Sequence, residues 1–205
     1  MAGDTHVIVC SYGGDDPTLV LRTLEAAAAQ GPVLLVDMSL ETGLAELAAA
    51  IGNVSVRHVP ESTGLGESRQ IGLMATDARY VAFLDSDAVP RGGWLGALRE
   101  AVDPADVGVA GGPVLPVWPE GRVPALFRTQ TGGDFLSMLD LGPKPLDVPR
   151  VLPGNMVVDR HLTGERVFTI ERGRRAATLA GAEEIARSEE RRVGKECRSR
   201  WSPYH

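Results

Sequence analysis

The sequence predicts an α/β fold, in which an open, mostly parallel sheet carries helices on both faces. Two observations support this prediction. Along the first half of the chain, short apolar segments with strand composition alternate with longer segments of helical composition. Glycine or proline stands at most of the junctions between them. Strands that alternate with helices at this spacing are typical of parallel sheets that are buried on both faces.

The individual elements follow in order from the same pattern. The first strand is expected at residues 6–11, where an apolar run ends before a loop of glycine and aspartate. Asp16 is a suitable N-cap for the next helix, since Pro17 occupies its first position and Gly31 ends it. The other strands are expected at residues 33–37, 54–58 and 80–84, and the helices at residues 18–30, 44–51, 66–75 and 94–102.

Beyond the last of these helices the pattern becomes irregular. Residues 107–117 are another strand candidate, but glycine and proline at positions 111–113 interrupt it. The chain that follows is rich in proline and glycine, which disfavour long regular elements. We therefore place a boundary near Pro113, which divides the chain into residues 1–113 and residues 114–186.

A pair of acids ends the fourth predicted strand. The apolar run from Tyr80 to Leu84 stops at Asp85, and Asp87 follows one residue after Ser86. In a continuing strand the two carboxylates would lie on one face but two residues, about 7 Å, apart, so they come close together only if the chain turns at Ser86. Such a turn places both at the carboxyl end of a buried strand, where open α/β sheets bind ligands. Carboxylate oxygens suit Mg or Mn. The alternative is that both acids only cap a turn.

The composition changes at Arg187. Residues 187–205, RSEERRVGKECRSRWSPYH, show no helical or strand periodicity and resemble the translated read-through of a sequencing adapter. We therefore expect the natural sequence to end at Ala186, truncated at its carboxyl end, and residues 187–205 to be a disordered, non-native tail. The alternative is a natural basic tail that binds an acidic partner.

Charge and cysteine content narrow the class of protein. The whole chain carries a net charge of -6, and without residues 187–205 it has 15 basic and 24 acidic residues. This acidic balance argues against a nucleic-acid partner. Cys10 is then the remaining cysteine, which excludes a disulfide framework. Without a signal sequence or a long apolar run, we expect a cytoplasmic protein, with peripheral membrane association only through a missing carboxyl-terminal part.

Four short motifs in order give the chain a family resemblance. They are Cys10-Ser11-Tyr12, Val36-Asp37-Met38-Ser39, Thr63-Gly64-Leu65-Gly66 leading to Ser68-Arg69-Gln70, and Phe83-Leu84-Asp85-Ser86-Asp87. With helix-length spacers between them, they resemble the pattern of family 2 glycosyltransferases of the GT-A fold. Two positions depart from that pattern, since Met38 replaces a second acid and Gln70 replaces an asparagine.

The resemblance implies a nucleotide-sugar site in residues 1–113 and the beginning of an acceptor-side half in residues 114–186. It places Ser11, Tyr12 and Asp37 around the base, and Arg69 at the base or the diphosphate. Ser86 lies between Asp85, implied to contact ribose and metal, and Asp87, implied to bind the metal. As alternatives, Asp37 ends a strand before a turn, and Arg69 is a surface residue that pairs with Glu67 or Asp77.

Two further segments resemble acceptor-side motifs. Gly154-Asn155-Met156 is similar to a Gly-Xaa-Asn-Met segment, and Gly181 to Ile185 is similar to a Gly-Gly-Glu-Asp motif. The second motif implies that Glu184 is the general base, with Glu183 as its neighbour. The alternative is a pair of solvated helix acids.

Together these resemblances imply an inverting transferase that depends on Mn or Mg. Its donor would be a nucleotide diphosphate sugar, with UDP as the favoured nucleotide, and its acceptor an unidentified glycan, lipid or small molecule. Two alternatives remain open: a nucleotide-binding domain of the same fold without turnover, and a sugar-phosphate nucleotidyltransferase.

Overall fold

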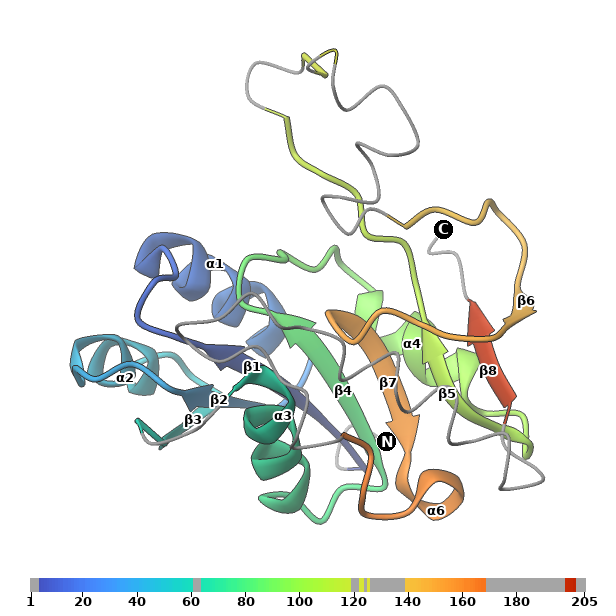
Figure 1. Ribbon diagram of the computed structural model, residues 1–205, viewed down its shortest axis with the longest axis horizontal. Helices are drawn as coiled ribbons and strands as arrows, with labels where there is room; N and C mark the ends of the chain where they lie inside the picture. Colours follow the sequence, from blue (N-terminus) through green and yellow to red (C-terminus); the bar gives the residue numbers. More distant parts are fainter. Residues whose placement is uncertain are drawn as a thin grey trace.

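A computed structural model of the chain describes residues 4–60, 64–118, 122–123, 125, 139–168 and 198–201. Its centre is an open sheet with the strand order β3-β2-β1-β4-β7-β5-β8-β6 (Figure 1). The strands are β1 (Thr5–Ser11), β2 (Val33–Asp37), β3 (Val54–His58), β4 (Tyr80–Asp85), β5 (Val107–Gly111), β6 (Leu146–Val148), β7 (Asn155–Asp159) and β8 (Arg198–Trp201).

The first four strands are parallel, as predicted. In their register Ser11 lies opposite Asp37 and Cys10 lies opposite Asp85. The carboxyl ends of β1, β2 and β4 therefore meet at one edge of the sheet, which is where an open α/β sheet offers a ligand site.

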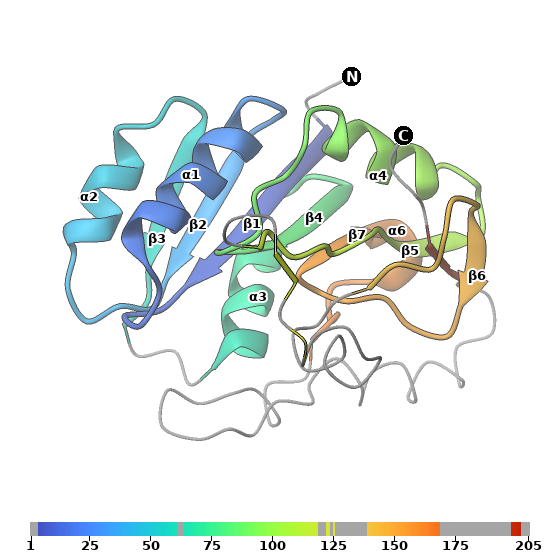
Figure 2. The same cartoon turned by 90° about the horizontal axis from the view of Figure 1, so that it is seen from above.

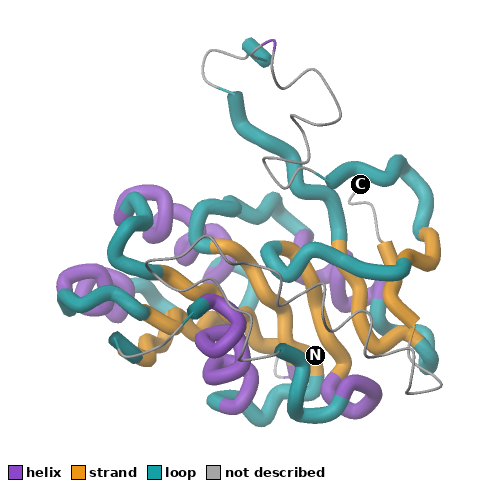
Figure 3. Tube along the Cα trace, viewed as in Figure 1, coloured by secondary structure: helices purple, strands orange, loops and turns teal. Residues whose placement is uncertain are grey.

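Helices cover both faces of this sheet (Figures 2 and 3). They are α1 (Pro17–Ala28), α2 (Gly43–Ala49), α3 (Leu65–Met74), α4 (Trp94–Ala101) and the short α6 (Arg160–Thr163). The predicted start of α1 is confirmed, since the Asp16 side chain accepts a hydrogen bond of 2.9 Å from the Thr18 amide. Among the described residues, no helix has the length and apolar character that crossing a membrane requires.

The alternation of side chains along the strands divides the core into two apolar layers. One layer joins Val7 and its neighbours to Leu24 of α1 and to α4. The other joins Ile8 to Leu73 of α3. Both faces of the strands are thus buried, which explains why their sequences are continuous apolar runs rather than alternating ones.

The sequence pattern did not predict strand β7 or its direction. It runs antiparallel between β4 and β5, with Leu84 opposite Asn155 and Ala110 opposite Val157. Residues 155–159, which we assigned to the acceptor-side half, therefore belong to the central sheet. An apolar pentapeptide has the same composition in either direction, so its direction depends on the path of the preceding chain.

The carboxyl-terminal residues differ from our expectation at four positions. Residues 187–205 were expected to be disordered, but Arg198–Trp201 forms β8, parallel to β5 and antiparallel to β6. Backbone hydrogen bonds supply this pairing, and they require no apolar periodicity in the sequence. The other residues of the segment lie outside the described part of the chain.

Candidate functional site

Asp37 is a fully buried acid at the end of β2, with 0% of its surface exposed. Its Oδ1 accepts hydrogen bonds from the Ser11 hydroxyl (3.3 Å), the Ser39 amide (3.0 Å) and the Ser39 hydroxyl (2.7 Å). Its Oδ2 is also buried and has no partner among the described residues. A buried carboxylate oxygen without a donor is costly, so this atom suits the N–H or O–H group of a ligand.

The two oxygens of Asp37 correspond to the two interpretations of this residue. The turn interpretation describes Oδ1, because its bond from the Ser39 amide is the usual link between an aspartate and the residue two positions later. That interpretation leaves Oδ2 without a function, which the ligand interpretation supplies.

The loop that carries Ser39 is held in place by a histidine to which we assigned no role from the sequence. The ring Nε2 of His58, at the end of β3, lies 2.7 Å from the Ser39 carbonyl oxygen. The Val59 amide also donates to the Asp37 carbonyl, at 2.7 Å. A lone histidine at the end of a strand gave no signal of this role, because the contact depends on the parallel pairing of β2 with β3.

Arg69 is buried, with 4% of its surface exposed, on the helix that covers the other face of the strands. Its Nη2 lies 2.7 Å from Oδ1 of Asp85, whose side chain is 43% exposed. Arg69 is therefore not a surface residue, as the alternative interpretation assumed. It contacts the acid motif at Asp85 instead. The pair presents a guanidinium and a partly exposed carboxylate at the end of β4, a combination suited to a charged oxygen ligand.

The chain turns directly after β4, as the acid spacing predicted. The Ala88 amide donates to the Asp85 carbonyl at 3.1 Å, which closes a turn around Ser86 and Asp87. Burial raises the pKa of Asp87 above its ordinary value, and the charge of Asp85 raises it further. The two acids thus lie close enough to interact, which favours the convergence interpretation over separate turn caps.

Asp15 is a third acid in this region, and we missed it in the sequence. Its Oδ2 accepts hydrogen bonds from the Ser86 hydroxyl (2.7 Å) and from the Tyr12 amide (3.2 Å). Burial raises the pKa of Asp15; the two hydrogen bonds oppose this rise, while the charges of Asp87 and Asp85 add to it. Since it lies beside the N-cap acid in a polar loop, nothing in the sequence distinguished it.

A divalent cation fits this arrangement through its carboxylates. No cluster of three or more His, Cys, Asp or Glu side chains with metal-binding geometry occurs among the described residues. Mg and Mn, however, are commonly held by one or two carboxylates together with the phosphates of a substrate. Asp85 and Asp87 supply such a pair of carboxylates, and the charge of Asp85 that helps to raise the pKa of Asp87 is one that a cation would offset.

Gly154 lies against Asp85 from the neighbouring strand. Its carbonyl accepts a hydrogen bond of 3.0 Å from the Asp85 amide. A Cβ atom built on Gly154 would lie 2.0 Å from Oδ2 of Asp85, so no larger residue fits there unless the carboxylate moves. The segment that resembled an acceptor-side motif thus shapes the acid site directly.

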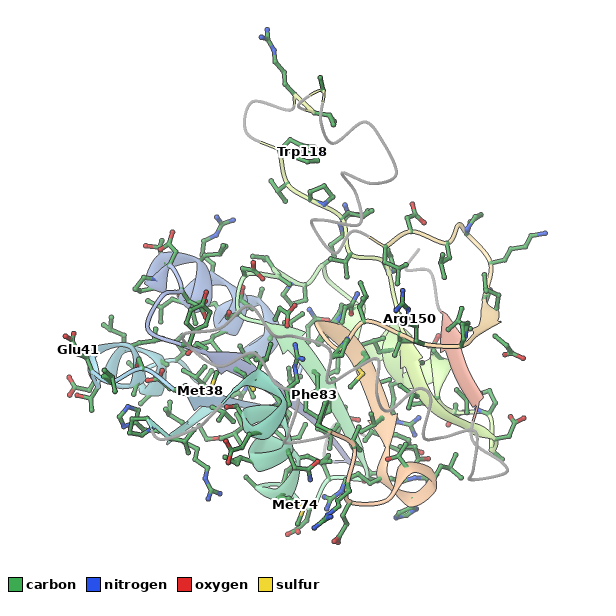
Figure 4. The ribbon with its side chains drawn as sticks, in the orientation of Figure 1. Met38, Glu41, Met74, Phe83, Trp118 and Arg150 are labelled. Atoms are coloured by element: carbon green, nitrogen blue, oxygen red, sulfur yellow. The ribbon has the colours of Figure 1, made fainter. Side chains whose placement is uncertain are left out.

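The remaining predicted residues lie as follows. Ser11 is fully buried, and Tyr12, the residue after β1, is 51% exposed. Met38 accepts a hydrogen bond at its sulfur from the Ser68 hydroxyl, at 2.6 Å, and Figure 4 shows Met38 next to α3. Glu183 and Glu184 lie outside the described residues, so their position is not part of the site geometry.

Comparison with known families gives one match. The model of the family described as Glycosyl transferase family 2 matches residues 6–137. This range includes the four motifs on which the resemblance was based.

Among curated proteins, the pre-mycofactocin glycosyltransferase of Mycobacterium tuberculosis (strain ATCC 25618 / H37Rv) is 48% identical over 46 residues. The aligned segment is 22% of this chain and 10% of that protein. The same protein of strain CDC 1551 / Oshkosh gives the same values.

Several solved structures share the fold. The crystal structure of S. aureus TarS 1–349 has a TM-score of 0.61 at 18% identity, covering 98% of this chain and 58% of that chain. Its complex with UDP-GlcNAc gives 0.60 at 16%, covering 98% and 59%. The mannosyltransferase PcManGT from Pyrobaculum calidifontis, in complex with GDP-Man and Mn²⁺, gives 0.62 at 15%, covering 98% and 56%. At these identities the likeness concerns the fold alone, and it confirms the predicted GT-A architecture.

Proposed function

Because the chain belongs to glycosyl transferase family 2, we propose that it binds a nucleotide diphosphate sugar and transfers the sugar to an acceptor hydroxyl. UDP is the proposed nucleotide, Mn or Mg the proposed cation, and inversion at the anomeric carbon the proposed outcome. The observation that carries the proposal is the buried Oδ2 of Asp37, which has no hydrogen-bond partner among the described residues, while Oδ1 accepts from the Ser11 hydroxyl. The imide N–H of uracil is a donor that this oxygen would accept.

The proposed site divides into a base end and a diphosphate end. At the base end, Tyr12 stacks on the base while Asp37 accepts from its edge. At the diphosphate end, Arg69 donates to phosphate oxygens, while Asp85 contacts ribose and shares the cation with Asp87. The cation, when bound, would neutralise charge on the leaving diphosphate. Ser86 fixes the turn between the two acids through its bond to Asp15.

Glu184 is the proposed general base that activates the acceptor. In this proposal its carboxylate takes the proton of the acceptor hydroxyl as that oxygen attacks the anomeric carbon from the face opposite the diphosphate. Glu183 would hold the acceptor or shift the pKa of its neighbour. This assignment is supported by the motif resemblance at Gly181 to Ile185.

The structural neighbours support a nucleotide-sugar donor. TarS 1–349 is described in complex with UDP-GlcNAc and with UDP, and PcManGT with GDP-Man and Mn²⁺. These ligands differ in the base, so they support the class of donor but leave the choice of base to Asp37 and its surroundings. Binding measurements with different nucleotides test which base the acceptor oxygen of Asp37 prefers.

Calorimetric titration tests the proposal. UDP should bind in the presence of Mn²⁺ and bind much more weakly in excess chelator, whereas GDP should bind more weakly than UDP under both conditions. Equal UDP affinity in chelator would contradict the role of the cation, and tighter binding of GDP would contradict the choice of base.

A second measurement separates a transferase from the alternatives. Metal-dependent hydrolysis of UDP-sugars, with and without added acceptor, reports the breaking of the anomeric bond. Binding without any hydrolysis would indicate a nucleotide-binding domain without turnover. Formation of a UDP-sugar from UTP and a sugar phosphate would indicate a nucleotidyltransferase.

A further inference from the structure

Gln70 lies next to Arg69 on α3, and its side chain makes three hydrogen bonds to the backbone of a distant segment. Its Nε2 donates to the Glu165 carbonyl at 2.7 Å. Its Oε1 accepts from the Val167 amide at 3.1 Å and from the Phe168 amide at 3.2 Å. With 9% of the residue exposed, the three hydrogen bonds form out of water, where each contributes more than on a surface.

The segment that Gln70 holds is in contact with the donor-site arginine. The ring of Phe168 packs edge-to-face on Phe83 of β4, with the centroids 4.9 Å apart (Phe83 is labelled in Figure 4). The guanidinium carbon of Arg69 lies 5.9 Å from the centroid of the same Phe168 ring. Because Arg69 pairs with Asp85, a continuous set of contacts leads from the Gln70 amide to the acid site.

The length of the side chain matters for these contacts. Asparagine, which the family pattern carries at this position, is shorter by one methylene, about 1.5 Å of reach. It cannot reach the Glu165 carbonyl and the two amides from the same helix position without a shift of the backbone. The departure at Gln70 therefore changes the attachment of residues 165–168 rather than the contacts of the base.

We propose that Gln70 is a positioning residue of the donor site. It fixes residues 165–168 so that Phe168 supports the Arg69 guanidinium, and Arg69 in turn stays oriented on Asp85 and on the diphosphate. This inference rests on the proposed function, since the consequence is measured on the diphosphate end of the donor. Nothing in the base end depends on it, because Ser11 and Asp37 share no contact with Gln70 or Phe168 among those described.

The chain contains a matched control. Gln30 makes the same type of contacts elsewhere: its Nε2 donates to the Ala26 and Arg91 carbonyls, at 3.2 and 2.9 Å, and its Oε1 accepts from the Leu95 amide at 3.1 Å. None of these partners belongs to the site. A variant at Gln30 therefore reports the general cost of losing a glutamine that joins two segments.

The test compares Gln70→Leu with Gln30→Leu in the full chain. We expect Gln70→Leu to weaken UDP binding with Mn²⁺ about tenfold, the size of one or two lost hydrogen bonds, and to leave uridine binding within about twofold. Gln30→Leu should change neither affinity. Hydrogen exchange at the Val167 and Phe168 amides should accelerate in Gln70→Leu alone.

Two further variants test the route through Phe168. The combined loss in Gln70→Leu with Phe168→Ala should not exceed the larger single loss, because both act on one set of contacts. Gln70→Glu keeps an acceptor for the two amides and loses the donor to Glu165, so it should restore part of the UDP affinity.

The proposal is overturned if Gln70→Leu lowers the melting temperature while UDP affinity stays at the wild-type value, or if uridine affinity falls equally. It is also overturned if the two losses in the double variant simply add. If the wild-type chain binds neither UDP nor uridine, the proposed function fails and the positioning role fails with it. Amide exchange then still reports whether the Gln70 contacts exist.

Discussion

The two carboxylate oxygens of Asp37 differ in their hydrogen bonds. Three donors from Ser11 and Ser39 converge on Oδ1, which fixes the side chain in one rotamer. Oδ2 is left buried without a protein donor among the described residues. A ligand that donates to Oδ2 therefore meets an acceptor that is already oriented, and its binding costs little side-chain entropy.

Asp37→Asn should weaken nucleotide binding without unfolding the protein. The amide keeps an oxygen for the three donors and places an NH₂ group where Oδ2 was, so it opposes the imide N–H of uracil. Loss of a charged hydrogen bond corresponds to about 1.5 to 3 kcal/mol in UMP affinity. Calorimetry and a thermal melt measure the two effects. Unchanged UMP affinity would support the turn-acid interpretation.

Asp87→Asn should stabilise the metal-free protein at neutral pH. The pKa of Asp87 is raised in the folded state by burial and then by Asp85, so ionising this acid is harder in the folded chain than in the unfolded one. Its contribution to stability is therefore most favourable at acid pH, where it is protonated, and is lost as pH rises through the raised pKa. Asp87→Asn cannot ionise, so it does not lose stability as the pH rises.

The direction of this stability change is checked by melting temperatures. They are measured for the wild type and for Asp87→Asn, without metal, from acidic to neutral pH. The variant should melt higher at neutral pH, and the difference should shrink as pH falls below the ordinary carboxyl pKa. Added Mn²⁺ should raise the melting temperature of the wild type and leave the variant nearly unchanged. A variant that responds fully to Mn²⁺ would remove Asp87 from the proposed cation ligands.

Between elements, the acid site depends on how closely β7 approaches β4. Gly154 precedes β7 and touches the Asp85 carboxylate, while Asn155 donates to the Pro113 carbonyl at 2.8 Å and accepts from the Trp94 indole at 2.7 Å. The start of the antiparallel strand thus contacts Asp85, helix α4 and the chain that follows β5. The position of Asp85 is a property of two strands, not of the acid motif alone.

Gly154→Ala should damage the acid site. The new methyl group would lie 2.0 Å from Oδ2 of Asp85, so the carboxylate or the strand must move, at about 1 to 3 kcal/mol of folding free energy. Metal-dependent UDP affinity should fall as well, because Asp85 leaves Arg69. Denaturant unfolding and calorimetry measure both.

Gly96→Ala on α4 is the control for this substitution. A Cβ atom there meets nothing within 4 Å, so the change should stabilise the helix by up to about 1 kcal/mol and leave UDP affinity unchanged. If Gly154→Ala behaves like Gly96→Ala, the approach of β7 to Asp85 is looser than the structure indicates.

The sequence predicted the elements better than their contacts. Bounds of β2 and β3 agree with the prediction, and the N-cap at Asp16 is confirmed, because these depend on local composition. Asp15 and Gln70 were not predicted as contacts of the site, since the Ser86 partner of Asp15 lies 71 positions away and the partners of Gln70 lie 95 or more positions away. Such contacts depend on strand order and on helix placement, which local patterns do not encode.

At the scale of the whole molecule, the site and the carboxyl-terminal strand lie apart in the sheet. β8 pairs with β5 and β6, whereas the site residues follow β1, β2 and β4. Residues 112–118 leave the sheet after β5, and Figure 4 shows Trp118 away from the sheet. Changes at β8 should therefore act on stability more than on nucleotide binding.

A chain that ends at Ala186 should bind UDP as the full chain does, within about twofold. Its melting temperature should be a few degrees lower, because the backbone pairing of β8 with β5 and β6 is lost. Thermal melts and titration of both chains measure this, and protease mapping should show Arg198–Trp201 protected in the full chain. Loss of UDP affinity would instead connect β8 to the donor site.

The insertion of β7 between β4 and β5 sets an order for folding. Each of the strands β1 to β4 has a partner among the first 85 residues, but β5 has no described neighbour on that side except β7, some 45 residues later in the chain. During synthesis, β5 must therefore wait unpaired until residues 155–159 leave the ribosome. The late arrival of β7 then controls when the two parts of the sheet join, and the unpaired, apolar β5 is the strand exposed to aggregation in that interval.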